Sequence, residues 1–592
     1  MYRAPLRELR FVLEELLGTG ALAGYPAYAE YSDELGASIL EEAARFAESV
    51  LDPLNRPGDR EGARWSPEGV RTPEGFRDAY RQFVAGGWPQ LGADPRFGGQ
   101  HVPQALSNAV QEILASANLA FKLCPMLTHG AVHALAQCAS EAQQQLYLPK
   151  MVSGEWTGTM VLSEPQAGSD LAQIRTRAAP EGDHYRLFGQ KIFITWGEHD
   201  FTENTIHMVL ARIDGAPPGV KGISLFIVPK VLVGPDGSPG ERNEVRCLSI
   251  EHKLGIHASP TCVMEFGRDK GAIGYLVGEP NHGLEYMFVM MNTARLAVGV
   301  EGYAVGERAF QQAAEYARSR LQGKSPGATG HAPSPIIEHP DVRRMLLTMK
   351  SCTEASRALA FYAGSQLDLG AHHSDEAVRR AALERGELLI PIVKGWCTET
   401  GNETAAIGVQ VHGGMGFVEE TGAAQYVRDV RITTIYEGTT GIQSNDLFGR
   451  KLARDRGAAM TALLGDMRRE LQAISATEAA VVQTRDAAAR AVTLLEQATG
   501  SLLQSMTANP ARAFAVSVPY LKLCGVVIGG WLLAKSAALA AAGLGGAERA
   551  FYQAKIRTAH FYAKQVLPRA LGLAQVVEEG ADSVLQSSAE LI

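Results

Sequence analysis

The chain has 592 residues, of which 46% are hydrophobic and 20% charged, a composition typical of a globular protein with several domains. Its 56 Lys and Arg residues stand against 64 Asp and Glu residues, which gives a formal net charge of −8. Because no basic block is present, the chain is not expected to bind nucleic acid.

Helices are predicted for residues 1–158, which we interpret as an N-terminal helical domain. Acidic and apolar residues alternate there at helical spacing, as in "DELGASILEEAARFAESVLDPLN" (33–55), and loops rich in Gly and Pro separate the segments.

The pattern then changes near residue 159. Short β-branched and aromatic runs separated by turns predict a β domain over 159–279. These runs are "TMVLSE", "HYRLFGQKIFIT", "TIHMVLARI", "ISLFIVPK" and "TCVMEF".

Helical spacing resumes near residue 280 and predicts a second helical domain over 280–455, interrupted by a loop at 321–340. The Ala-rich remainder, 465–592, predicts an extra C-terminal helical domain. Its most apolar stretch, 520–546, is interrupted by two lysines, whereas about 20 apolar residues are needed to cross a bilayer. We therefore expect a buried helix and no transmembrane segment, with contact at a membrane surface as the alternative.

The fold class predicted from this order is α+β and mostly α. Helices and strands do not alternate, so a Rossmann fold is not expected. The glycine clusters at 18–24 and 413–416 lack the G-x-G-x-x-G spacing, and there is no P-loop.

The seven cysteines are scattered and form no Cys-x-x-Cys pair. This argues against a disulfide framework and is typical of a reducing cytoplasm, where we expect the protein to reside. His129 and His133 have i,i+4 spacing but lack the Glu of an H-E-x-x-H motif, so no metal site is expected. The charged start of the chain does not have the pattern of a signal peptide.

Four stretches carry residues suited to chemistry. "MVLSEPQAGSD" (160–170) ends a strand in a small-residue turn whose N–H groups suit phosphate or a flavin edge. "GQKIFITWGEHD" (189–200) offers a flat aromatic surface and a hydroxyl, and "VQVHGGMG" (409–416) allows close backbone approach to a ligand. In "RITTIYEGTTGIQ" (431–443), a desolvated Glu437 would have the raised pKa of a general base. Each stretch taken alone also fits an ordinary turn, strand end or surface carboxylate.

Together and in this order, the four stretches resemble the acyl-CoA dehydrogenase family, whose motifs appear here as "SEPQAGSD", "FIT", "QVHGGMG" and "IYEGTTGIQ". The resemblance covers about residues 35–455. The two ends of the chain resemble a long bacterial subgroup of this family, which includes the 3-methylmercaptopropionyl-CoA dehydrogenases. The resemblance implies the family fold, with FAD between the β domain and the second helical domain.

The resemblance also implies which residues contact FAD, and it places Thr195 near flavin N5. Five of these positions would reach the FAD of a neighbouring subunit, which implies a homo-oligomer, with a dimer expected because the C-terminal domain would replace a tetramer contact. The expected contacts within the subunit are Met160, Leu162, Ser163, Gly168, Ser169, Phe193, Ile194, Thr195, Thr439, Thr440 and Gly441. Those to the neighbouring subunit are Arg320, Gln322, Gln410, Gly413 and Gly414.

For the acyl-CoA thioester, the family positions fall on Ser169, Asn292, Arg295, Tyr436 and Gly438. Glu437 matches the catalytic base. Some relatives carry the base at the position of Ala294, and because alanine cannot abstract a proton, this comparison favours Glu437.

The implied reaction is α,β-dehydrogenation of an acyl-CoA to a trans-2-enoyl-CoA. Glu437 would remove the α-proton while flavin N5 takes the β-hydride, and an electron-transferring flavoprotein would accept the electrons. The substrate would be 3-methylmercaptopropionyl-CoA or a fatty acyl-CoA, as in β-oxidation. The alternative is an acyl-CoA oxidase or flavin monooxygenase on the same fold.

Overall fold

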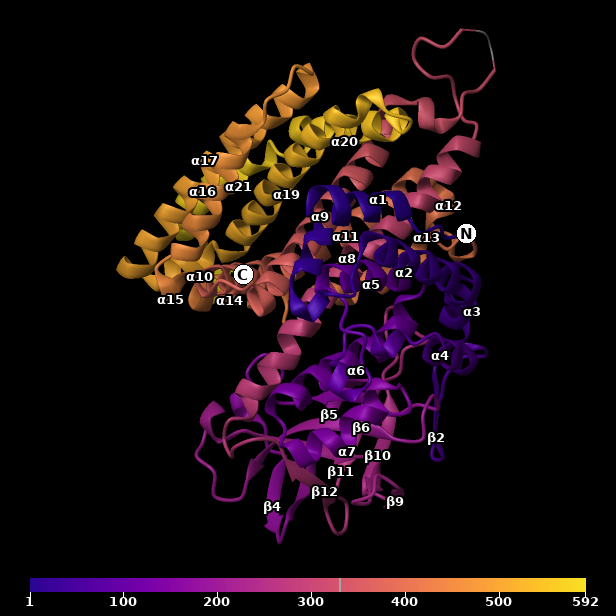
Figure 1. Cartoon of the computed structure of the whole chain (residues 1–592), viewed down its shortest axis with the longest axis vertical. Coiled ribbons are helices and arrows are strands. Elements are labelled where there is room, and N and C mark those ends of the chain that lie inside the picture. Colours follow the sequence, from indigo (N-terminus) through magenta and orange to yellow (C-terminus); the bar gives the residue numbers. More distant parts are fainter. Residues whose placement is uncertain (330–331, 592) are drawn as a thin grey trace. The chain divides into compact units, whose positions relative to one another are not determined.

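The computed structural model describes residues 1–329 and 332–591, which pack as two compact units (Figure 1). The helical unit consists of Met1–Glu42, Pro103–Ser116 and Arg295–Ile592, and the sheet-containing unit of Ala43–Val102 and Ala117–Ala294. Residues 1–158 therefore contribute to both units.

The strand pairings of the sheet-containing unit close into a ring. The long strand β5 pairs antiparallel with β4 and with β12, β12 pairs with β7, β7 with β6, and β6 returns in parallel to β4. β3 extends this sheet beside β6, and β11 and β10 extend it beside β5. The strands are β3 (Thr157–Val161), β4 (Arg177–Glu181), β5 (His184–Thr195), β6 (Thr205–Ile213), β7 (Ser224–Pro229), β10 (Val245–Ile250), β11 (Thr261–Phe266) and β12 (Ala272–Leu276).

The core of this sheet consists of residues two apart along each strand, because alternate side chains of a strand point to the same face. Val209 and Ala211 of β6 and Phe226 and Val228 of β7 are fully buried in one cluster. The cluster also contains Val161, Ala178, Leu187, Ile194, Val245, Cys262, Met264, Phe266 and Ala272.

Each of the five predicted runs contains a strand, but the sequence prediction missed others. β4, β10 and β12 of the main sheet, and the ribbon of β8 (Val231–Val233) with β9 (Pro239–Arg242), are short, and β4 and β9 also contain Pro and charged residues, so their strand signal is weak. A further ribbon of β1 (Arg64–Ser66) and β2 (Gly69–Arg71) interrupts the region predicted as helical, and the indole of Trp65 donates to the carbonyl of Cys247, 2.9 Å away.

The sheet-containing unit also contains helices, of which α6 (Leu119–Cys138) packs against β3. The helix α7 (Glu141–Val152) begins with a capping box, because Ser140 accepts from the N–H of Gln143 while the Gln143 side chain accepts from the N–H of Ser140. Further helices of this unit are α3 (Asp52–Glu61) and α4 (Phe76–Ala85). Three helices pass from one unit to the other: α2 (Asp33–Phe46), α5 (Gln104–Ala117) and α8 (Gly283–Ser319).

The helical unit is built around α9 (Pro340–His372), whose middle is buried on all sides. Its helices also include α1 (Leu6–Arg10), α10 (Glu376–Ile392), α11 (Thr398–His412), α12 (Gly414–Phe417), α13 (Ala423–Val430), α14 (Thr440–Asp446) and α15 (Ala453–Asp455). The C-terminal region adds α16 (Ala458–Ala473), α17 (Ala479–Ala508), α18 (Pro510–Ala515), α19 (Ser517–Ala542), α20 (Arg549–Gln565), α21 (Arg569–Glu579) and α22 (Ala581–Leu585).

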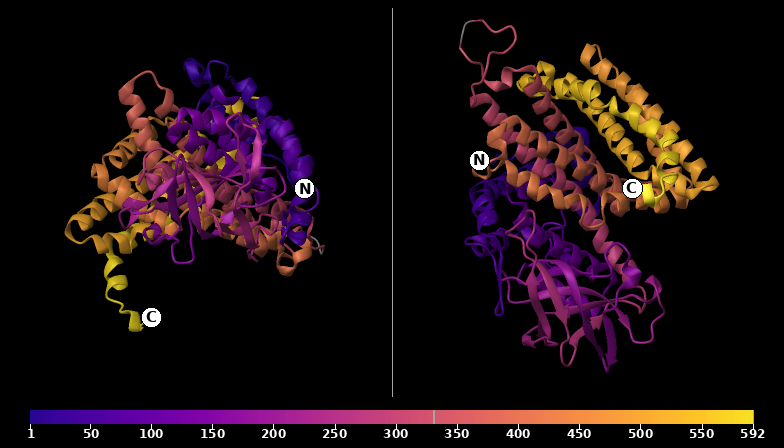
Figure 2. Two further views of the ribbon diagram at one scale, coloured as in Figure 1. Left: turned by 90° about the horizontal axis from the view of Figure 1, so that it is seen from below. Right: turned by 180° about the vertical axis from the view of Figure 1, so that it is seen from behind.

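The C-terminal helices pack side by side, and Figures 1 and 2 show α16, α17, α19, α20 and α21 as one orange-to-yellow bundle. At its centre lies α19, the apolar stretch of the sequence. By length and composition the segment Ser517–Gly545 would suffice to cross a membrane, yet 83% of its most apolar window is buried inside the protein. That burial is what the core helix of a bundle shows, as the sequence predicted.

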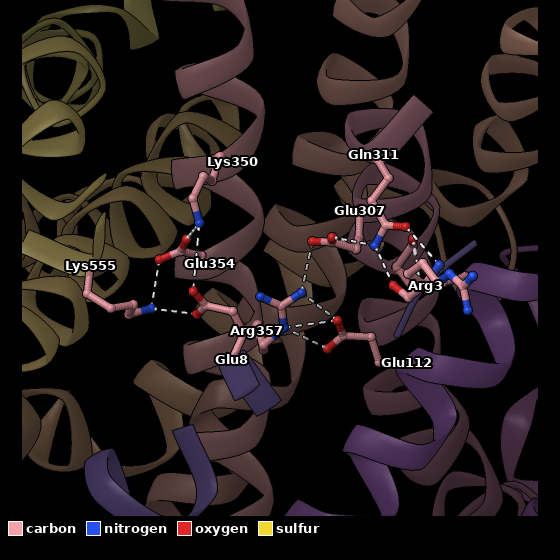
Figure 3. A network of polar contacts seen from close by, with 11 residues as sticks. Arg3, Glu8, Glu112, Glu307, Gln311, Lys350, Glu354, Arg357 and Lys555 are labelled. Carbon is pink, nitrogen blue, oxygen red and sulfur yellow. Dashed lines mark hydrogen bonds and ion pairs between the residues drawn. The ribbon is translucent and has the colours of Figure 1, made fainter. Parts of the chain in front are cut away.

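Charged side chains are buried in the middle of the helical unit (Figure 3). Arg357 of α9 contacts Glu112 of α5 at 2.6 Å and Glu307 of α8 at 3.0 Å. One turn away on α9, Glu354 contacts Lys555 of α20 at 2.7 Å, and it also pairs with Lys350. Lys555 reaches Glu8 of α1 at 2.8 Å, so this network joins the N-terminal and C-terminal helices to α9.

Candidate active site

Glu437 lies in a tight turn of the helical unit, between a 3-10 helix (Arg431–Thr434) and α14. Its backbone φ is 55°, in the left-handed region, and the next residue, Gly438, has a φ of 90°. A non-glycine residue held there costs on the order of 1–3 kcal/mol, so the surrounding contacts must impose the conformation.

Three side chains from three different elements hold this turn by its carbonyl groups. Gln443 Nε2 of α14 donates to the carbonyl oxygens of Glu437 and Gly438, at 3.0 and 3.2 Å. Arg295 Nε of α8 donates to the Glu437 carbonyl at 3.4 Å, and Lys394 Nζ donates to the Gly438 carbonyl at 2.6 Å. Both peptide planes that flank the Cα of Gly438 are thereby fixed.

The backbone N–H and the carboxylate of Glu437 are the groups that a reaction would use. Within the described chain, its backbone N–H donates to no protein group and its carboxylate accepts no hydrogen bond and forms no ion pair. The side chain is partly exposed. The turn therefore presents a carboxylate and one N–H donor to a molecule that enters from solvent.

Burial raises the pKa of Glu437 to about 7, and the negative charge of Glu301 adds to this effect, whereas Arg295 and Lys394 oppose it. Burial likewise lowers the pKa of Lys394 to about 7, against the stabilising charge of Glu437. A carboxylate with such a pKa accepts protons at neutral pH more readily than an exposed glutamate.

Further polar contacts fix the residues next to the turn. The Tyr436 hydroxyl donates to the buried carboxylate of Glu301 in α8. Thr440 Oγ1 donates to Glu399 Oε1 of α11 at 2.8 Å. Arg295 also forms a buried ion pair with Asp446 at 3.2 Å, which orients the guanidinium toward the turn. Thr439 caps α14 by accepting from the N–H of Ile442 at 3.3 Å.

In the sheet-containing unit, a buried carboxylate organises the turn after β3. Glu164 pairs with Lys191 of β5 at 2.9 Å and accepts from the N–H groups of Arg175 and Thr176, at 2.6 and 3.0 Å. Although burial alone raises the pKa of Glu164, Lys191 and these hydrogen bonds lower it to about 2. Lys191 also donates to the carbonyl of Leu162 at 2.8 Å.

The same turn leaves backbone donors available. Gly168 and Ser169 are exposed, and in the part of the chain that the structure describes their N–H groups donate to no protein acceptor. Of the other predicted cofactor contacts here, Met160 is buried in β3, and Leu162 and Ser163 are partly exposed.

A β-bulge shapes the other predicted cofactor segment. Cys262 pairs with Ile194 and Met264 with Lys191, so that two residues of β5, Ile192 and Phe193, oppose one of β11. Phe193 has a φ of 59° and its side chain is 61% exposed. Ile194 packs instead into the sheet core, so only its backbone is available to a ligand, and Thr195 is partly exposed.

The remaining predicted residues also fall at the surface or at helix ends. Arg320, Gln322, Gln410, Gly413 and Gly414 are exposed, and a Cβ built on Gly413 or Gly414 would meet nothing within 4 Å. Asn292, on the part of α8 that belongs to the sheet-containing unit, and Gly441 of α14 are partly exposed.

Sequence reasoning missed Lys394, Gln443, Glu301 and Asp446 in the helical unit, and the Glu164–Lys191 pair in the other. Gln443 stands inside the quoted "IYEGTTGIQ" stretch. Lys394 gives one usable signal, because it is the single charge in "LLIPIVKGWC" (388–397), and a charge in an apolar run needs a partner.

Models of the acyl-CoA dehydrogenase family match nearly the whole chain. The N-terminal domain matches residues 34–155, the middle domain 159–268, the C-terminal domain 281–452, and an acetyl-CoA dehydrogenase C-terminal-like domain 463–588. The chain therefore belongs to the acyl-CoA dehydrogenase family and is an FAD-dependent oxidoreductase.

Among its relatives, the chain is 47% identical to the 3-methylmercaptopropionyl-CoA dehydrogenase of Ruegeria pomeroyi, over 99% of this chain and 100% of that protein. It is 34% identical to the broad-specificity linear acyl-CoA dehydrogenase FadE5 of Mycobacterium tuberculosis, over 99% and 98% of the two chains. The predicted resemblance to the long bacterial subgroup is thus confirmed.

Solved structures show the same fold along nearly the full length. Caenorhabditis elegans ACDH-11, in complex with C11-CoA, superimposes with a TM-score of 0.77 at 19% identity and covers 98% of this chain and 96% of its own. A Bacillus anthracis acyl-CoA dehydrogenase complexed with FAD gives a TM-score of 0.73 at 20% identity, over 96% and 91%. These matches confirm the predicted fold class, including the extra C-terminal helical region.

Proposed function

We propose that this enzyme dehydrogenates an acyl-CoA thioester at its α and β carbons, with Glu437 as the base that removes the α-proton. The observation that carries the proposal is the turn at Glu437. Its carbonyls are bound by Arg295, Lys394 and Gln443, while the carboxylate and N–H of Glu437 have no partner among the residues that the structure describes.

The free N–H of Glu437 supports a second role for the same residue. A thioester carbonyl that accepted a hydrogen bond from it would carry the negative charge that develops when the α-proton leaves, and preorganised donors of this kind lower the barrier most. The carboxylate of the same residue then faces the adjacent carbon. One fixed backbone thus sets the positions of both the donor and the base.

The residues present fit FAD, because the N–H groups of Gly168 and Ser169, which bond to no acceptor in the described part of the chain, can bind polar edges, and the exposed ring of Phe193 can cover a flat ring system. When bound, FAD supplies the N5 acceptor for the hydride from the β-carbon. We propose that it is held by Met160, Leu162, Ser163, Gly168, Ser169, Phe193, Ile194, Thr195, Thr439, Thr440 and Gly441, and by Arg320, Gln322, Gln410, Gly413 and Gly414 of a second subunit.

The substrate proposed is 3-methylmercaptopropionyl-CoA, which rests on the 47% identity to the Ruegeria enzyme over its full length. Ser169, Asn292, Arg295, Tyr436 and Gly438 are the proposed contacts to the thioester. We further propose a homodimer in the cytoplasm that passes its electrons to an electron-transferring flavoprotein.

The experiment that tests the function is anaerobic mixing of the FAD-loaded enzyme with acyl-CoAs while the absorbance of oxidised flavin is followed. The panel runs from 3-methylmercaptopropionyl-CoA to short and long straight chains. One class should bleach the flavin of the wild type, and Glu437→Gln should slow this step by about 10²–10⁴-fold, the usual contribution of a general base.

The controls separate the parts of the proposal. If Glu437→Gln bleaches as fast as the wild type, Glu437 is not the base. If the wild type is bleached only by straight-chain substrates, the reaction stands and the proposed substrate is wrong. Rapid reoxidation of the reduced enzyme by oxygen would favour an acyl-CoA oxidase.

A further inference from the structure

Lys394 is a buried lysine in an unusual backbone segment. It lies in a π-helical turn, η10 (Val393–Cys397), between α10 and α11, and its side chain is 0% exposed. Such turns interrupt a regular helix and are frequent at functional sites. An ammonium group placed in an apolar segment costs free energy unless other groups compensate for its lost hydration.

The compensation comes from the turn at Glu437. Lys394 Nζ donates to the Gly438 carbonyl at 2.6 Å, and within the described residues it forms no ion pair at 4.0 Å or less. A structural lysine would gain more from a directly bonded carboxylate. Lys394 instead bonds the peptide that follows the proposed base.

The charged groups around this pair come from several elements. Lys394 interacts with the charges of Glu437, Arg295, Glu399 and Glu301. Three of these have partners of their own. Arg295 pairs with Asp446, which Arg450 of the following π-helical turn also approaches at 3.7 Å. Glu399 pairs with Lys522 of α19 at 3.5 Å, and Glu301 accepts a hydrogen bond from the Tyr436 hydroxyl. Lys394 and Arg295 are therefore the cations that act directly on the charge of Glu437.

We infer that Lys394 is a positioning residue for the proposed reaction: its ammonium group fixes the Gly438 peptide, which sets the orientation of Glu437, and its charge favours the ionised base. The inference rests on the proposed function only in its kinetic part. The hydrogen bond and the charge make separate contributions, because an amide retains a donor while it removes the charge.

Two substitutions separate the contributions. Lys394→Met keeps the length of the side chain and removes both donor and charge, whereas Lys394→Gln keeps a donor. Lys451→Met is the matched control, because Lys451 is a largely buried lysine of the same unit that pairs with Glu387 at 3.1 Å. Each variant is prepared with FAD, and its flavin content and melting temperature are measured first.

The kinetic readout is the pH profile of anaerobic flavin reduction by the acyl-CoA that bleaches the wild type. Lys394→Met should lower the limiting rate by about 10–100-fold, since small misplacements of reacting groups have effects of this size. Its acid limb should move to higher pH, because a cation that favours the carboxylate is gone. Lys394→Gln should recover part of the rate and keep the shifted limb, while Lys451→Met should match the wild type.

A second readout does not need turnover. The carboxyl stretch of Glu437, identified in infrared difference spectra by its absence in Glu437→Gln, is titrated in the FAD-loaded enzyme without substrate. The midpoint should rise in both Lys394 variants. If it does not move, or if Lys394→Met retains the wild-type rate, the inference is wrong.

Failure of the proposed function looks different, because the wild type would then not be bleached while the infrared titration still shifted. Should Lys394→Met fail to fold, the titration of Lys394→Gln decides.

Discussion

At the scale of single residues, Glu437 shows how the protein obtains a base from an ordinary carboxylate. Burial and the neighbouring Glu301 disfavour its charge, and two cations limit the effect, so that its pKa is about 7. An exposed glutamate would be ionised at neutral pH but would be a weaker proton acceptor. The left-handed backbone of Glu437 is held in place by hydrogen bonds to the carbonyls of Glu437 and Gly438.

The first prediction concerns pH. Proton abstraction requires ionised Glu437, so the rate of flavin reduction at low substrate should fall as the pH drops through about 7 and should level off about one pH unit above that value. Stopped-flow reduction between pH 4 and 9 measures this. An acid limb at the ordinary glutamate value, near 4.5, would show that the active form lacks the described environment.

Substitutions at Glu301 and Tyr436 test why the pKa of Glu437 is raised. Its negative charge raises the pKa of Glu437, so Glu301→Gln should move the acid limb to lower pH. Tyr436→Phe removes the hydrogen bond that Glu301 accepts but not the charge, so its acid limb should remain in place whatever its rate. If both variants shift the limb equally, the shift reflects disturbed packing rather than charge.

At the scale of elements, the sequence predicted the strands and the motifs better than the side chains that hold the motifs in place. β5, β6 and β11 coincide with predicted runs because they are rich in β-branched and aromatic residues. Glu437 was predicted as a site residue through the family resemblance of its motif, since the stretch alone also fits a surface carboxylate. Lys394 was not, because its role depends on a hydrogen bond to a residue 44 positions away, and sequence reasoning shows only an isolated charge.

The support of the turn extends to the C-terminal helices, because α19 packs directly on the π-helical turn that carries Lys394. Gly525 of α19 faces Trp396 so closely that an added Cβ would lie 2.1 Å from the indole Cγ. Ser517 at the start of α19 bonds Ser444 of α14 at 3.0 Å. The C-terminal region therefore braces two of the three elements that hold the carbonyls of Glu437 and Gly438, namely α14 and the turn that carries Lys394.

Gly525→Ala tests this brace. The methyl group must displace Trp396, so we expect a loss of about 1–3 kcal/mol in unfolding free energy and slower flavin reduction, because Lys394 lies on the same turn. Gly500→Ala is the control: it lies in α17 with nothing within 4 Å of the added Cβ, and it should gain about 0.5–1 kcal/mol without a change in rate. Thermal melting and stopped-flow reduction measure both. A Gly525→Ala enzyme with wild-type stability would show that α19 does not press on Trp396.

At the scale of the whole helical unit, buried charges join segments that are far apart in the chain. Lys555 of α20 contacts both Glu354 of α9 and Glu8 of α1, so one ammonium group connects the C-terminal, central and N-terminal helices (Figure 3). Although burial raises the pKa of Glu354, Lys350 and Lys555 together lower it to about 2 from its ordinary value of 4.5.

The lowered pKa of Glu354 determines how the stability of the fold should depend on pH. A carboxyl whose pKa is lower in the folded state stabilises the fold above its unfolded pKa, near 4.5, and the contribution is lost as the pH falls toward 2. Lys555→Met leaves buried carboxylates short of a cation, so at pH 7 it should cost about 3–5 kcal/mol. The difference from the wild type should shrink as the pH falls below 4.5, because Glu354 takes up a proton more readily in the variant, which lacks one of the two cations that lower its pKa.

Melting temperatures of the two proteins between pH 7 and 3 measure this difference directly. Lys564→Met, on an exposed position of the same helix, serves as the control and should stay within about 0.5 kcal/mol at every pH. A Lys555→Met deficit that persisted unchanged at pH 3 would mean that the lysine acts through its cation–π contact with the ring of Phe11, 4.8 Å from its ammonium group, rather than through the carboxylates. The linkage of the chain ends would then depend on this ring and not on Glu354 and Glu8.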